Sequence, residues 1–123
     1  MTILNAQGSR LAVIRPGNTT AATAFTASVN TEITRIFVCN TSGATRTFRI
    51  FHGASGDSFD EENALFWDVE VAADTTYEVF ADSPNSGIML STGDIVGVRS
   101  DSADGLTFSI YGVTASIAPG VRN

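Results

Sequence analysis

The chain has 123 residues and a formal net charge of −6 at neutral pH, and all seven of its cationic residues are arginine. A chain of this length predicts a single domain. The acidic balance and the scattered arginines exclude the basic surface that nucleic acid or an anionic membrane requires. The single cysteine, Cys39, allows no intrachain disulfide, and no apolar run approaches the roughly 18 residues of a transmembrane helix.

The first third of the chain alternates between short β-prone segments and turns. Leu11–Ile14 and Ala22–Val29 are predicted strands, separated by the breaker Pro16-Gly17-Asn18. The segment Ile33–Asn40 carries apolar side chains at both odd and even positions. This pattern is typical of a central strand that is covered on both faces.

The middle of the chain continues with two more strands. Thr47–His52 is one of them, and Ala64–Val71 alternates cleanly between apolar and polar positions. Alternation over Ala64–Val71 predicts a half-buried strand with Trp67 facing the core and Phe66 exposed. Asp68 and Glu70 would share its solvent side, where opposing charge on the next strand is the simplest explanation for them.

Further short strands are expected downstream, and no window has a sustained helical period. About eight strands with turn signals roughly every ten residues predict an all-β, antiparallel, jelly-roll-like sandwich. We expect an N-terminal arm over residues 1–16, a β-sandwich over 17–115 and a C-terminal tail over 116–123. Such ends are usually disordered unless something, here a neighbouring subunit, holds them. The downstream strands are expected around Tyr77–Val79, Gly87–Leu90, Ile95–Arg99 and Leu106–Tyr111.

The loop Gly53–Asn63 is the best candidate for chemistry, because it clusters four carboxylates beside the only histidine, His52. Such a cluster could hold a calcium ion, but its spacing does not match an EF-hand. The favoured interpretation is a solvated loop whose charges prevent edge pairing. The loop acids are Asp57, Asp60, Glu61 and Glu62.

Catalytic patterns are not evident. His52 has no second histidine or nucleophile motif to act with, and Cys39 has no base near it in sequence. Carboxylate pairs suited to glycoside hydrolysis exist, but plainer explanations are available for them. We therefore expect no enzyme activity, no cofactor and no bound metal.

Five segments, in their order, carry a family resemblance. They are ITRIFVCNTS, TFRIF, NALFWDVEVAADTTYEV, GIMLSTGDIVGV and LTFSIYGV, which span about two-thirds of the chain. In this order they resemble a small all-β family of structural proteins found in tailed bacteriophages. The resemblance implies a virion component of the head surface or the tail, with no catalytic residues.

Three functions are compatible with the sequence. The first is a capsid decoration or cement protein, a homotrimer that binds the major capsid protein on the virion surface and is made in the host cytoplasm. The second is a tail, neck or fibre component, and the third is a carbohydrate-binding module or small sugar hydrolase that uses Phe66 and the loop acids. No nucleic-acid or membrane partner is expected. The expected subunit or capsid contacts are Arg10, Leu11, Val13, Arg15, Phe66 and Arg122.

Overall fold

A computed structural model describes residues 8–80 and 87–115 of the chain, and these residues form two packed antiparallel sheets. This confirms the predicted all-β sandwich, with nine strands in place of the expected eight or so. In the first sheet, β1 (Ser9–Ile14), β9 (Leu106–Thr114), β3 (Thr31–Asn40) and β6 (Thr76–Val79) lie side by side, and β7 (Ile88–Leu90) also pairs with β3. The second sheet is ordered β2 (Ala22–Thr26), β8 (Ile95–Ser100), β4 (Arg46–Gly53) and β5 (Ala64–Val71).

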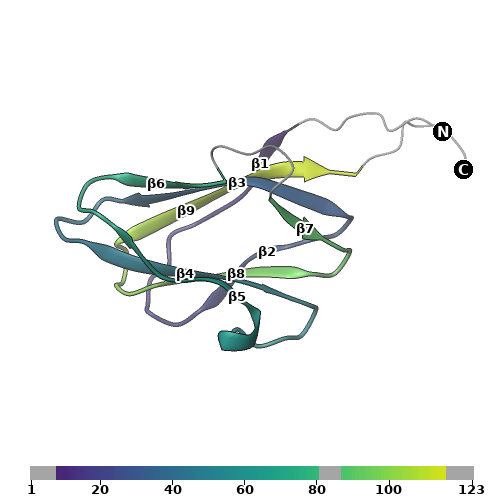
Figure 1. The fold of residues 1–123 in the computed structure, drawn as a ribbon, viewed down its shortest axis with the longest axis horizontal. Helices are drawn as coiled ribbons and strands as arrows, with labels where there is room; N and C mark the ends of the chain where they lie inside the picture. Colours follow the sequence, from purple (N-terminus) through teal and green to yellow (C-terminus); the bar gives the residue numbers. More distant parts are fainter. Residues whose placement is uncertain (1–7, 81–86, 116–123) are drawn as a thin grey trace, which may run out of the picture.

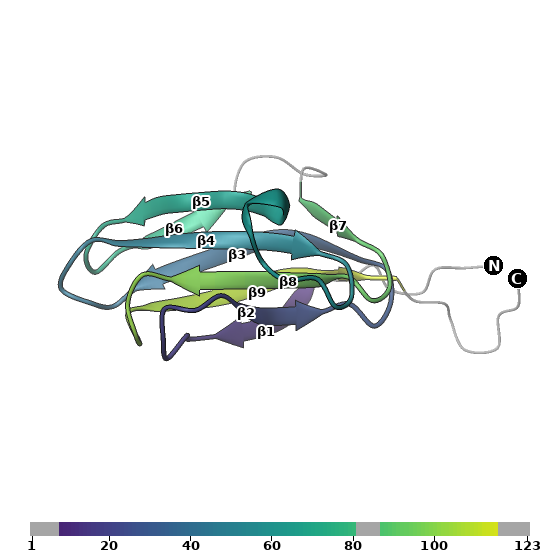
Figure 2. The same ribbon diagram turned by 90° about the horizontal axis from the view of Figure 1, so that it is seen from below.

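The two sheets form the two layers of Figure 1, and most connections cross from one layer to the other. Seen from below, β1 and β2 lie along one side of the sandwich and β5 and β6 along the other (Figure 2). If β6 and β7 are counted as one interrupted strand, this is the strand order of a jelly roll, the topology expected from the sequence. No helix among the described residues is long and apolar enough to cross a membrane.

The core lies between the sheets and is built from the inward-facing side chains of both. Phe48 of β4 and Phe108 of β9 meet edge to face with ring centroids 6.0 Å apart, which joins the layers at the centre. Asn40 at the end of β3 is a buried polar residue that is fully satisfied, because its Nδ2 donates to the carbonyl oxygens of Val71 and Ala44, both at 2.9 Å. It ties the turn after β3 to the end of β5.

A β-bulge explains why β3 carries apolar residues in both registers. Ile33 pairs with Gly112 of β9 and Arg35 pairs with Tyr111, so Thr34 is an extra residue on β3. The extra residue shifts the inward-outward alternation by one position, so that Ile33 and Ile36 both point into the core. The central position predicted for β3 is confirmed, because β9 lies along one edge of β3 and β6 and β7 along the other. The expected cover on both faces is not seen among the described residues, since Arg35 is exposed and Phe37 and Cys39 are partly exposed on the outer face.

β5 has two bulges, and the one opposite Arg49 overturns the predicted facing of its aromatic residues. Val69 pairs with Phe48 and Phe66 pairs with Ile50, so two residues of β5 face the single residue Arg49 between them. Asp68, one of the two, has a φ of 53°, in the left-handed region. Phe66 therefore packs on the core and Trp67 faces solvent, which is the reverse of the prediction.

The predicted loop folds back over the outer face of the second sheet. Phe59 of this loop lies on Phe51, with ring centroids 5.5 Å apart, and Phe51 is only 2% exposed although it points away from the core. The approach needs a glycine beneath the ring, because a Cβ on Gly97 would lie 2.5–2.7 Å from three Phe59 ring atoms. The outer face of the second sheet thus carries a small apolar cluster of its own.

The strand predicted at Leu11–Ile14, within the expected N-terminal arm, is confirmed. Residues 9–14 are the edge strand β1, which pairs with β9, so they belong to the sandwich. The remaining arm residues at the very N-terminus, 1–7, and the expected tail over 116–123 lie outside the described residues.

The contact between Phe59 and Gly97 predicts non-additive mutations. Gly97→Ala should destabilise the protein by about 1–3 kcal/mol, because the new methyl group displaces the Phe59 ring. In a Phe59→Ala background the same change should cost well under half as much, which urea unfolding of the four variants would measure. Equal costs in the two backgrounds would show that the ring does not lie on Gly97.

Candidate functional site

The five expected contact residues that the structure describes do not form one surface. Arg10 and Val13 are exposed on β1, whereas Leu11 is half-buried against the core and Phe66 packs inside it. Arg15 donates from Nε and Nη2 to the carbonyl oxygen of Asp104, at 3.0 and 2.6 Å, so it holds the β8–β9 loop. Arg122 lies outside the described residues.

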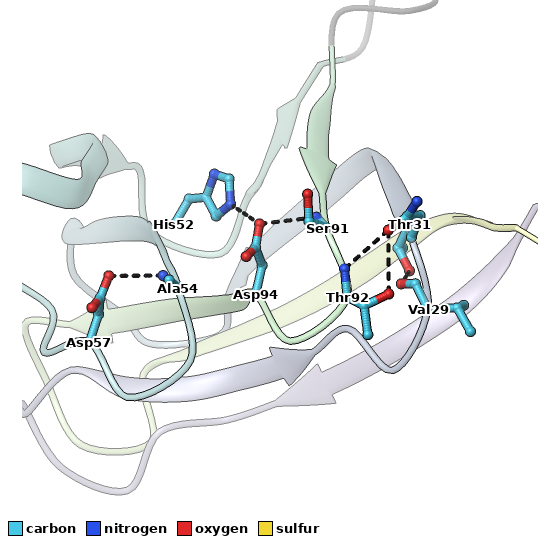
Figure 3. A network of polar contacts seen from close by, with 9 residues as sticks. Val29, Thr31, His52, Ala54, Asp57, Ser91, Thr92 and Asp94 are labelled. Carbon is cyan, nitrogen blue, oxygen red and sulfur yellow. Dashed lines mark hydrogen bonds and ion pairs between the residues drawn. The ribbon is translucent and has the colours of Figure 1, made fainter.

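His52 has a structural role in this arrangement. Its Nε2 donates to Oδ2 of Asp94 at 3.0 Å, and the same oxygen accepts the backbone N–H of Ser91 at 3.0 Å (Figure 3). These two hydrogen bonds, that from His52 above all, lower the pKa of Asp94. The pair joins the end of β4 to the turn between β7 and β8.

Two of the four loop acids are used within the loop. Oδ2 of Asp57 accepts the backbone N–H of Ala54 at 2.9 Å, and Asp60 caps the short 3₁₀ helix η1 (Glu61–Asn63). In residues 8–80 and 87–115, no three His, Cys, Asp or Glu side chains are grouped closely enough to hold a metal ion. The structure therefore gives Asp57 and Asp60 a conformational role.

The outer face of the first sheet is the surface that stands out. Strand register places Tyr111 between Arg10 and Arg35, and the next row across the sheet holds Val13, Ser109 and Phe37. Phe37 and Tyr111 pack edge to face with centroids 5.6 Å apart, and both stay partly exposed. We call this surface the docking face; its members are Arg10, Val13, Glu32, Arg35, Phe37, Cys39, Glu78, Met89 and Tyr111.

The docking face mixes exposed apolar and exposed charged side chains, and its charges balance. Val13 is 52% exposed and Met89 68%, whereas Phe51 on the opposite outer face is covered. Its two arginines are matched by two glutamates, and Arg35 and Glu78 form an ion pair at 3.1 Å. The net charge of −6 therefore resides elsewhere on the chain. Exposed apolar side chains with little net charge are typical of a protein-binding surface.

A second group of side chains lies on the outer face of the second sheet. Arg49 donates to both carboxylate oxygens of Asp68, at 2.6 and 3.1 Å, and its guanidinium lies 3.5 Å from the centroid of the Trp67 ring. The hydrogen bonds from Arg49 lower the pKa of Asp68, and those to Asp68 raise the pKa of Arg49. The prediction that Asp68 faces an opposing charge on the next strand is confirmed.

Sequence reasoning did not single out Phe37 or Met89 as surface residues, and it placed Trp67 inside. Strict alternation cannot show a bulge, and each of the bulges at Thr34 and in β5 changes which side chains point outward. The positive φ of Asp68 is compatible with the tolerance of aspartate for the left-handed region, which is the one weak signal available.

Comparisons with protein-family models, with curated proteins and with solved structures find no match for this chain.

The Asp94 pair predicts a pH-dependent stability difference. The pKa of Asp94 is lower in the folded chain than in the unfolded one, so its contribution is present at neutral pH and is lost as pH falls through the folded pKa. Asp94→Asn should melt at a lower temperature than the wild type at pH 7, and the gap should close below about pH 4. Glu62→Gln, at an exposed position on η1, serves as the control and should not change the melting temperature. A gap between Asp94→Asn and the wild type that is constant with pH would contradict this role.

Proposed function

We propose that this chain is a non-enzymatic structural protein of a bacteriophage virion, and that it binds the lattice of the major capsid protein as a decoration or cement protein. The observation that carries the proposal is the docking face, which holds the exposed Val13 and Met89 and the partly exposed Phe37–Tyr111 pair. Apolar groups held on a rigid sheet bind a partner at little cost in conformational entropy. The virion setting comes from the order of the five phage-like segments.

The sheet edges favour side-chain docking over strand addition. β1, β2 and β5 each carry a bulge, and the fourth edge is shared by the short strands β6 and β7. Bulged and interrupted edges prevent pairing with another chain. A partner is therefore expected on a face of the sandwich.

The fold is compatible with this function without defining it. Jelly rolls occur in viral capsid proteins and in lectins, so the architecture serves both assembly and ligand binding. A homotrimer is the proposed assembly, because capsid lattices offer threefold positions and closed cyclic symmetry suits such sites. The carbohydrate hypothesis used Phe66, which is partly buried and packs against the core, so this residue offers less exposed surface than the sequence suggested.

Charge substitutions on the docking face test the proposal. Val13→Arg combined with Met89→Arg should weaken binding to particles that lack this protein by about tenfold or more, because each arginine must be desolvated in an apolar contact. Binding is measured by co-sedimentation with purified particles. Melting temperatures establish that the variants fold.

Val29→Arg is the matched control, since Val29 is an exposed valine in the turn before β3 and not on the docking face. Its binding should equal that of the wild type. Undiminished binding by the double variant would refute the docking face, and binding restricted to isolated tails would favour the tail or fibre function instead.

A further inference from the structure

Trp67 is turned outward by an irregular backbone. Regular alternation along β5 would place it in the core, but the bulge opposite Arg49, with the left-handed Asp68, brings it to the surface, where it is 44% exposed. A left-handed non-glycine residue costs about 1–3 kcal/mol and persists only where the surroundings hold it. Bulges that re-aim a side chain are common next to functional sites.

The Trp67 ring is contacted by two neighbouring side chains. The guanidinium of Arg49 lies 3.5 Å from its centroid, and Phe51 meets it edge to face with centroids 6.3 Å apart. Arg49 is itself fixed by its two hydrogen bonds to Asp68. A ligand that stacks on the ring therefore meets a surface that is already ordered, so little conformational entropy is lost on binding.

Polar groups around the ring retain hydrogen-bonding capacity. Arg99 gives its Nε–H to the carbonyl oxygen of Thr19 at 3.1 Å and has its Nη1 3.6 Å from Asp68. A guanidinium has five N–H donors and a carboxylate about four acceptor sites, so the bonds found among the described residues do not exhaust either group. An apolar ring face thus lies beside both donors and acceptors.

These features point to one ligand class. A pyranose sugar has a face of C–H groups, which the electron-rich face of an indole attracts, and a rim of hydroxyl groups that both donate and accept hydrogen bonds. Arg49 and Arg99 are balanced by Asp68 and by Glu61, whose charge acts on Arg49. The local charge therefore favours a neutral saccharide.

We propose that Trp67, with Arg99 and Asp68, is a binding site for a neutral saccharide on the outer face of the second sheet. The site lies on the other sheet from the docking face, so both can be occupied at once. Trp67 supplies the stacking surface, Arg99 donates to ring hydroxyl groups, and Asp68 accepts from them.

The chain has only one tryptophan, so its fluorescence reports this site alone. The protein is titrated with maltohexaose, chitohexaose and soluble mannan, and emission is followed in the absence of particles. We expect at least one of them to change the emission with a Kd of about 0.1–1 mM. No change with any of them would overturn the proposal and would leave the virion function untouched.

Variants of Trp67 test whether its ring binds saccharide. Trp67→Ala should weaken saccharide binding by about tenfold or more in affinity electrophoresis, and Trp67→Phe should retain part of it because a flat ring remains. Met89→Ala, which removes an exposed apolar side chain on the docking face, should bind as the wild type does. If Trp67→Ala still binds saccharide as the wild type does, the proposed site is wrong. The site is also wrong if no saccharide binds the wild type and Trp67→Ala abolishes particle binding.

Discussion

The central strand β3 is hydrogen bonded along both of its edges, and the rest of the fold depends on that constraint. β9 pairs along its length on one side, and β6 and β7 share the other. A strand that is hydrogen bonded on both edges cannot rotate about its own axis. The alternation of inward and outward side chains therefore changes only where an extra residue is inserted. The bulge at Thr34 is that insertion; it lets Ile33 and Ile36 both enter the core while Phe37 and Cys39 remain outside.

Bulges also occur in the edge strands, where they affect how the protein can meet a partner. Bulges in β1, β2 and β5 and the interruption between β6 and β7 leave no described edge that is long and regular. Since edges of this kind resist strand addition, the two outer faces become the surfaces available for partners. One is covered by Phe59 and carries the ordered Trp67 group, and the other exposes Val13 and Met89. The division of the two faces between two proposed partners follows from this asymmetry.

Much of the fold could be predicted from the sequence because alternation and turn residues are local signals. The strand segments, the sandwich and the central place of Ile33–Asn40 were all predictable in this way. The site was less predictable. Whether a side chain points outward depends on whether its position in the strand is odd or even, and one inserted residue reverses this pattern for the remainder of the strand. Phe66 and Trp67 exchanged places for this reason. Phe59 over Gly97 is a contact between residues distant in sequence, and no periodicity reports it.

Footprinting of the protein on particles tests the docking face most directly, because the face carries the only cysteine, Cys39, together with Met89. Thiol alkylation of Cys39 and oxidation of Met89 are compared in the free and the particle-bound protein, with oxidation of Trp67 as an internal reference on the other sheet. We expect both docking-face residues to become several-fold slower to react on binding while Trp67 does not change. Protection of Trp67 with unchanged reactivity of Cys39 and Met89 would contradict the assignment of the docking face.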